Sequence, residues 1–227
     1  MDRREFLKVC GGGLVTLLLS GCGTSVVGSG STQGNVKPAP KGSVSGGKHM
    51  KIVVINSSPH SDAESTSRYI SAAFTEGAKS AGHDVFVFDA ANGDTHPCRG
   101  CDACHMDGPC IFKDDIEKVL MPKMLEADLL VLVTPLYYFT VSAQLKTVID
   151  RFYSRTSKLN GKKSMIISTA YNNDDWTMTA LDTYYNRLVS YMNWKNVGKV
   201  YGVGCGSRSL VESSKFPGMA REIGKNL

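Results

Sequence analysis

Several features that define common classes of protein are missing from this chain of 227 residues. Its apolar run at 11–19 falls short of the roughly 20 residues that a membrane-spanning helix needs. Lysine and arginine form no stripe with interleaved aromatics, so the net charge of +5 gives no argument for nucleic-acid binding. The chain also has no internal repeat. What is left is the composition of an ordinary soluble globular domain with extensions.

Two familiar phosphate-binding motifs are missing as well. The loop "NSSPHSDAESTSRYI" at 56–70 lacks both the lysine of a Walker loop and the G-x-G-x-x-G of dinucleotide-binding folds. It is instead rich in hydroxyl groups and ends where a helix is predicted to begin. Free N–H groups and the helix dipole attract a phosphate at such a place. A plain polar turn with Ser65 or Thr66 as the helix cap is the alternative.

Residues 1–21 have the layout of an export signal, with a charged start, a short apolar run and a small-residue end. Arg3 and Arg4 match a twin-arginine signal. The sequence "LSGC" at 19–22 resembles a bacterial lipobox, which would make Cys22 the lipidated first residue of the mature protein. We therefore expect an extracytoplasmic protein with a lipid anchor. An unprocessed membrane-anchoring start is the alternative.

A Gly-, Ser- and Pro-rich stretch without apolar periodicity fills 22–49 and predicts a flexible tether. The folded domain is expected at 50–227. Translation from Met50 is a second possibility, and it would give a cytoplasmic protein.

Strand-like and helix-like patterns alternate from residue 51 onwards. This alternation predicts an α/β protein with right-handed crossovers and a parallel sheet covered by helices on both faces. Five strands favour a flavodoxin-like three-layer sandwich with strand order 2-1-3-4-5, whose ligands bind beyond the carboxyl ends of the strands. The expected strands are 51–56, 81–90, 128–134, 163–170 and 197–205, and the expected helices are 65–81, 113–127, 142–153, 176–192 and 213–226.

Two further loops at the predicted ligand edge are rich in aromatics. "TPLYYFTVSAQLK" at 134–146 follows the third strand, and "STAYNNDDW" at 168–176 follows the fourth. Aromatics after a buried strand are usually core residues, but at this edge they can flank a flat heteroaromatic ring. A phosphate site beside two ring-binding loops suggests FMN.

These segments, together with "CRGCDACHMDGPCIFKDD", resemble the NADPH-dependent FMN reductase family, in its branch of iron–sulfur flavoproteins, over residues 51–226. The first loop usually reads G-S-P-R in that family, whereas Ser57 and His60 stand at its first and fourth positions here. The resemblance names no catalytic residue. It implies that FMN phosphate is bound by Ser58, His60, Ser65, Thr66 and Ser67, and that the isoalloxazine ring meets Pro135, Leu136, Tyr137, Tyr138, Phe139, Thr169, Ala170 and Tyr171.

Lys146, Asp150 and Arg151 follow the second of these loops at helical spacing, and the first two form an i,i+4 pair. We expect them to have a structural or subunit-contact role rather than a catalytic one.

Four of the seven cysteines are concentrated at 98–110. Closely spaced thiolates are standard ligands of iron–sulfur clusters. The resemblance implies a [4Fe–4S] cluster on Cys98, Cys101, Cys104 and Cys110, at the carboxyl edge of the sheet and near a flavin of the same or a neighbouring subunit. Free cysteines, disulfides, and zinc with His96 or His105 remain alternatives. Cys205 is expected on the fifth strand as a buried apolar residue.

We therefore expect an FMN-dependent oxidoreductase that passes electrons from NAD(P)H to a small acceptor, as a homodimer or homotetramer. A membrane-tethered electron carrier, fed by a redox partner, is the second hypothesis. Export favours the second, because NAD(P)H is not available outside the cell. A cofactor-free binding lipoprotein is a third and weaker possibility.

Overall fold

The structure, a computed structural model, describes residues 49–227. Its centre is an all-parallel sheet of order β2-β1-β3-β4-β5, which confirms the flavodoxin-like prediction. The predicted signal, the tether and Cys22 lie outside the described residues. The strands are β1 (Lys51–Asn56), β2 (Asp84–Asp89), β3 (Leu129–Pro135), β4 (Lys163–Thr169) and β5 (Lys195–Gly202).

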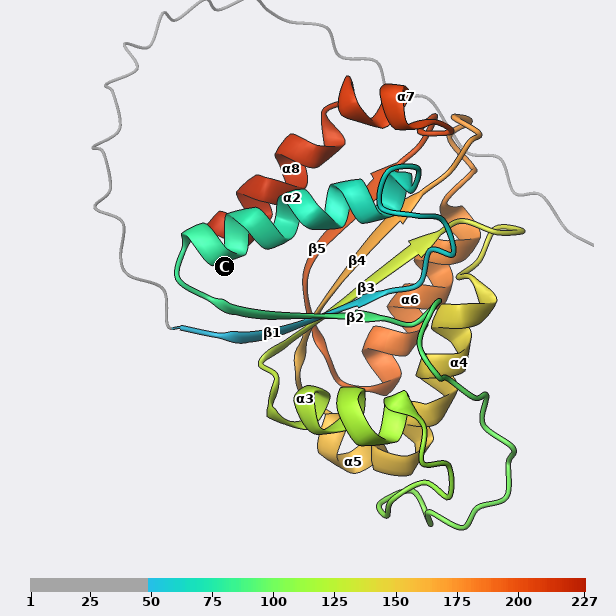
Figure 1. Cartoon of the computed structure of the whole chain (residues 1–227). Coiled ribbons are helices and arrows are strands. Elements are labelled where there is room, and N and C mark those ends of the chain that lie inside the picture. Colours follow the sequence, from blue (N-terminus) through green and yellow to red (C-terminus); the bar gives the residue numbers. More distant parts are fainter. Residues whose placement is uncertain (1–48) are drawn as a thin grey trace, which may run out of the picture. The chain divides into compact units, whose positions relative to one another are not determined.

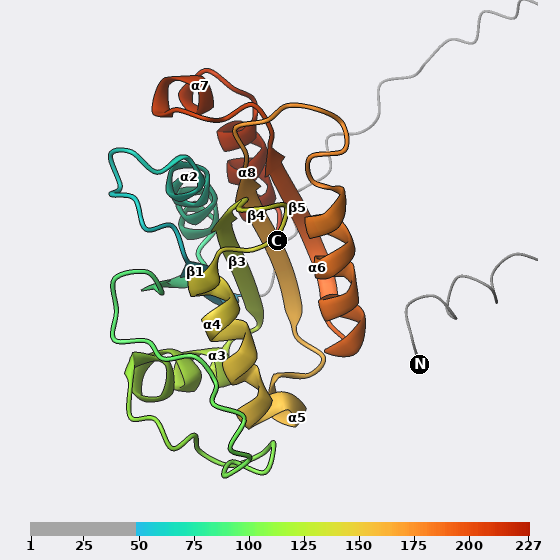
Figure 2. The same cartoon turned by 90° about the vertical axis from the view of Figure 1, so that its right-hand side faces the viewer.

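Helices cover both faces of the sheet, as Figures 1 and 2 show. One face carries α2 (Thr66–Ser80), α7 (Arg208–Glu212) and α8 (Phe216–Lys225). The other carries α3 (Met121–Glu126), α4 (Ala143–Arg151), α5 (Thr156–Leu159) and α6 (Thr179–Tyr191), with a π-helical turn η1 (Ile116–Leu120) and a 3₁₀ turn η2 (Phe152–Arg155). Among residues 49–227, no helix is both long and apolar enough to cross a membrane.

The strands are buried on both sides, so successive residues feed two separate cores. Ile52 and Val54 pack with Phe74 of α2, whereas Val53 and Ile55 face the core beneath α3, α4 and α6. This is why the central strands are continuous β-branched and aliphatic runs rather than alternating ones.

Several elements differ from the sequence-based expectation, and three of the differences have consequences for the fold. The helix expected at 113–127 opens with the π turn η1, and Pro122, which has no N–H to donate, lies in the first turn of α3. Strand β5 occupies 195–202 rather than 197–205, because Gly204, at φ +68°, turns the chain. Cys205 is therefore buried beyond the strand instead of within it. The short helix α7 was not expected from the sequence.

Candidate cofactor site and cysteine loop

An open cavity of about 640 Å³ lies at the carboxyl edge of the sheet, between the three loops that the sequence nominates. Its volume is typical of a site for a small molecule or cofactor. One side is lined by Ser58, His60, Ser65, Thr66 and Ser67. The other side is lined by Pro135, Leu136, Tyr137, Thr169, Ala170 and Tyr171.

The hydroxyl-lined side is the N-terminus of the 15-residue helix α2. Ser65 is the N-cap, and its Oγ accepts the Arg68 N–H at 3.2 Å. The backbone N–H groups of Thr66 and Ser67 have no hydrogen-bond acceptor within residues 49–227. The Oγ1 of Thr66 donates to the Oγ1 of Thr169 at 2.8 Å and so ties the first loop to the third. Ser65 therefore caps the helix, and two free N–H groups still remain for an anion.

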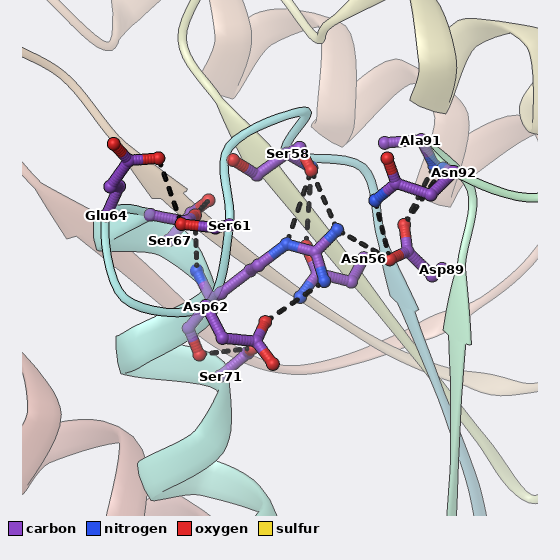
Figure 3. Close-up of polar contacts among 12 residues, drawn as sticks. Asn56, Ser58, Ser61, Asp62, Glu64, Ser67, Ser71, Asp89, Ala91 and Asn92 are labelled. Atoms are coloured by element: carbon purple, nitrogen blue, oxygen red, sulfur yellow. Dashed lines mark hydrogen bonds and ion pairs between the residues drawn. The ribbon is translucent and has the colours of Figure 1, made fainter.

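The shape of the first loop depends on Arg68, which sequence reasoning missed. Its partners Ser58, Asp62 and Asp89 are labelled in Figure 3. Its guanidinium donates to the Ser58 carbonyl at 2.8 Å and pairs with Asp89, at the end of β2, at 2.8 Å. It also reaches Asp62 at 3.2 Å. A positive charge in the first turn of a helix is unfavourable, because it opposes the helix dipole. The position of Arg68 in the first turn of α2 was therefore a signal in the sequence that this side chain has a specific partner.

The second loop is fixed to the first by a pair of buried hydroxyl groups. The Ser142 Oγ lies 2.9 Å from the Ser57 Oγ, which itself donates to the Val133 carbonyl at 2.8 Å. Ser142 is also the N-cap of α4. Ser57 thus adds a bond between two loops of the site.

Tyr138 and Phe139 do not line the cavity, although the sequence nominates them for the flavin ring. They are the two central residues of a tight turn closed by paired bonds of 3.2 Å between the backbones of Tyr137 and Thr140. Both have positive φ, 46° and 65°, as a type I′ turn requires. Large L-residues rarely adopt this conformation, which costs roughly 1–2 kcal/mol each. The turn leaves Tyr138 97% exposed.

The segment after β5 also contributes residues that sequence reasoning missed. Arg208, Ser207 and Cys205 line the cavity. The Arg208 guanidinium stacks 3.9 Å from the ring centre of Tyr69 and donates to the Asp62 carbonyl at 2.7 Å, which holds α7 beside the first loop. Burial raises the pKa of the Cys205 thiol, so it is uncharged at neutral pH.

The cysteine loop, residues 97–110, does not stay at the carboxyl edge, and in this respect the expectation was wrong. It leaves the end of β2 and runs along α4 toward α3 and α5 (Figures 1 and 2). There the Asp107 side chain pairs with Lys158 at 3.2 Å and accepts from Ser157 at 3.1 Å. Both partners precede β4 by only a few residues, so this part of the loop lies toward the amino ends of the strands.

One continuous segment, 151–158, holds most of the cysteine loop. Within it, the Tyr153 hydroxyl donates to Asp102 at 2.8 Å, and Arg155 donates to the Gly108 carbonyl and pairs with Glu117 at 3.0 Å. The loop is therefore built on a helical platform by hydrogen bonds between protein groups.

The platform begins with a buried ion pair. Arg151 and Asp114 are each 1% exposed and form bonds of 2.6 and 3.2 Å. Arg151 also donates to the His96 carbonyl at 3.0 Å, so it joins both ends of the cysteine loop. The Asp114 Oδ1 caps the following turn through the Glu117 N–H, whereas Asp115 makes no such bond. Lys146 and Asp150 form the expected i,i+4 pair on the exposed face of α4.

The four cysteines of the loop are free thiols that line one narrow cavity of about 20 Å³. The Gly100 N–H donates to the Cys98 sulfur at 3.4 Å, and Asp102, His105 and Met106 have positive φ. Within residues 49–227, no group of three His, Cys, Asp or Glu side chains could hold a single metal ion. Four cysteine thiols are a donor set that suits an iron–sulfur cluster. The cavity between them has room for only about one water molecule. The exposed side of the loop would therefore have to move outward to admit a cluster.

Fold and cavity together define a flavodoxin-like protein whose cavity, at the switch point of the sheet, is suited to a phosphate and a ring. A family model described as NADPH-dependent FMN reductase matches residues 50–203. The chain belongs to this family. Membership confirms the expected family, whose description names NADPH and FMN.

The relatives point to one branch of the family. An iron-sulfur flavoprotein of Archaeoglobus fulgidus is 30% identical over 161 residues, 69% of each chain. Another from the same organism is 38% identical over 102 residues, 45% of this chain and 48% of the relative, so here the chain spans about half of the relative's length. An iron-sulfur flavoprotein of Methanocaldococcus jannaschii is 35% identical over 102 residues, 45% of this chain and 51% of the relative.

Solved structures share the fold. An NAD(P)H:quinone oxidoreductase from Methanothermobacter marburgensis has a TM-score of 0.62 at 22% identity, covering 78% of this chain and 96% of that one. An azoreductase from Bacillus anthracis has a TM-score of 0.57 at 15% identity, covering 78% and 99%. At these identities the likeness concerns the fold alone.

Proposed function

We propose that this protein is an FMN-dependent oxidoreductase that passes electrons from NAD(P)H or a redox partner to a small acceptor. The observation that carries the proposal is the cavity of about 640 Å³, where the open N-terminus of α2 faces two ring-flanking loops. FMN, when bound, supplies the reversible redox chemistry of its ring. The protein binds it, orients it and limits the access of water.

The geometry of the cavity assigns different residues to the phosphate and to the ring of FMN. The N–H groups of Thr66 and Ser67 and the hydroxyls around them would hold the phosphate, with the α2 dipole adding to the attraction. Residues 135–137 and 169–171 would flank the ring. The bonds from Thr66 to Thr169 and from Ser142 to Ser57 keep these loops at a fixed separation.

A [4Fe–4S] cluster on Cys98, Cys101, Cys104 and Cys110 is the second part of the proposal. Its support is the shared cavity of the four thiols, the N–H donor to Cys98, and the iron-sulfur flavoproteins among the relatives. Disulfides and zinc are the rival states. The path of the loop along α4 favours electron exchange with the flavin of a neighbouring subunit, in a homodimer or homotetramer, over a short route within one chain.

A membrane-tethered electron carrier is the alternative function, and the features at 1–22 favour it. In this version twin-arginine export and lipidation of Cys22 hold the protein outside the cytoplasm. A redox partner then replaces NAD(P)H as the donor. Comparing flavin reduction by NADPH with reduction by low-potential carriers separates the two versions.

The central experiment is a visible spectrum with flavin and iron analysis on anaerobically purified protein. Flavin peaks with about four irons per chain support the full proposal, flavin without iron removes the cluster, and a colourless protein contradicts the function.

The phosphate site is tested by Ser67→Ala, with Ser71→Ala, one turn further along α2, as the matched control. Loss of one hydrogen bond to a charged group should weaken FMN binding about tenfold or more. Binding of riboflavin, which lacks the phosphate, should stay unchanged in both variants. Equal loss for FMN and riboflavin would show that Ser67 does not contact the phosphate.

A further inference from the structure

Four exposed aromatic residues stand beside the cofactor cavity and form what we call the aromatic rim. Tyr138 and Phe139 come from the turn after β3, and Tyr171 and Trp176 from the segment after β4. Their exposed fractions are 97%, 43%, 87% and 56%. So much aromatic surface in one place marks a binding site more often than it marks inert surface.

The rim is continuous with the cavity. Tyr171 lines the cavity, and so does Tyr137, which directly precedes the turn. The rings of Phe139 and Trp176 lie 5.2 Å apart, within the range of interacting aromatic pairs, and so join the two loops. A ligand that contacts this pair would stand next to whatever occupies the cavity.

The backbone of the turn holds the rim outward. Tyr138 and Phe139 both occupy the left-handed region, which favours glycine and asparagine. Strain of this kind clusters at active sites, ligand clamps and switch regions. Here it keeps two large rings out of the core and beside the cavity mouth.

We propose that the aromatic rim binds the electron acceptor, a flat aromatic molecule without negative charge, through stacking on Phe139 and Trp176. This inference rests on the proposed oxidoreductase function. Two exposed carboxylates, Asp174 and Asp175, directly precede Trp176 and repel anions. A neutral quinone therefore fits the rim better than a sulfonated one.

The two tryptophans of the chain allow a direct binding test. Trp194 is buried and donates to the Leu159 carbonyl at 2.6 Å, so Trp194→Phe leaves Trp176 as the only reporter. Titration of the flavin-loaded full chain with 2-methyl-1,4-naphthoquinone should quench this fluorescence saturably. Trp176→Phe, which keeps only Trp194, should show no saturable quenching, and this second variant stays informative if Trp194→Phe fails to fold.

Kinetics supply the second readout. Flavin pre-reduced with dithionite is reoxidised by the naphthoquinone or by ferricyanide, which does not stack. Phe139→Ala and Trp176→Ala should raise the half-saturating naphthoquinone concentration about three- to tenfold and leave the ferricyanide rate unchanged. Tyr191→Ala, which removes an exposed aromatic of α6 outside the rim, is the control and should change neither.

The possible outcomes separate the hypotheses. The proposal is overturned if the half-saturating naphthoquinone concentration is unchanged in both Phe139→Ala and Trp176→Ala. It is also overturned if the quenching of Trp176 fluorescence depends on protein concentration, because a second copy of the chain then covers the rim. A sulfonated naphthoquinone that binds as well as the neutral one overturns the charge preference. If neither acceptor reoxidises the wild-type flavin, the proposed function fails rather than the rim.

Discussion

At the scale of single residues, the Asp114 carboxylate connects protein stability to pH. Burial alone would raise its pKa, but hydrogen bonds from Arg151 and from the N–H groups of Glu117 and His96 outweigh burial and hold the pKa below its ordinary value. The folded state therefore binds this proton less readily than the unfolded chain, whose Asp pKa is about 3.9. The pair stabilises the fold above that pH, and its contribution is lost as the pH falls through the lower folded pKa.

The variant Asp114→Asn tests this linkage. It leaves Arg151 buried without its counter-charge, so the free energy of unfolding at pH 7 should fall by about 3 kcal/mol. The variant should also lose less stability than the wild type between pH 5 and pH 2. Urea unfolding across this range measures both effects. Glu126→Gln, which breaks an exposed ion pair with Lys51, is the control and should change stability by no more than about 0.5 kcal/mol. Parallel pH profiles of Asp114→Asn and wild type would contradict the argument.

At the scale of the element, the turn at Tyr138 and Phe139 exposes two aromatic rings, and its left-handed backbone lowers the stability of the fold. Replacing both residues with Asn-Gly, through Tyr138→Asn and Phe139→Gly, supplies the pair that type I′ turns favour. The free energy of unfolding should rise by about 1 kcal/mol, since relief of strain exceeds the added entropy of the unfolded chain. Thermal and urea unfolding measure this. Lower stability in the variant would mean that contacts of the two rings, such as the one with Trp176, outweigh the strain.

How well the sequence predicts the structure also differs between strands, turns and loops. The strands and their order could be predicted, because a run such as 51–56 has few alternatives to a strand buried on both faces. The cavity loops follow from strand order. The conformation at Tyr138 could not be predicted, because bulky residues with positive φ contradict local propensity. The path of the cysteine loop depends on bonds from Arg151, Arg155 and Lys158, partners about 50 residues away, and nothing in "CRGCDACHMDGPC" indicates them.

At the scale of the whole molecule, the proposed export and lipid anchor predict where the protein resides. If Cys22 carries the lipid, the wild-type protein should fractionate with membranes, and Cys22→Ala should release it to a soluble fraction. Flavin content should be equal in both, because the cofactor cavity lies wholly within residues 58–208. Labelling with a radioactive fatty acid checks lipidation directly. Recovery of the wild type in the cytosol, with Met50 as its first residue, would contradict export.

Helix α4 links the two chemical regions of the molecule, since it begins beside the ring-flanking loop and ends in the platform of the cysteine loop. Its nine residues span roughly 14 Å. One inserted or deleted residue would rotate the platform by about 100° around the helix axis relative to the cavity. Natural variants of this protein should therefore accept changes of length within the cysteine loop, whose tip is exposed, whereas α4 should vary in composition but keep its residue count. In evolutionary terms, we expect the spacing and phase of the two regions to be inherited as one unit.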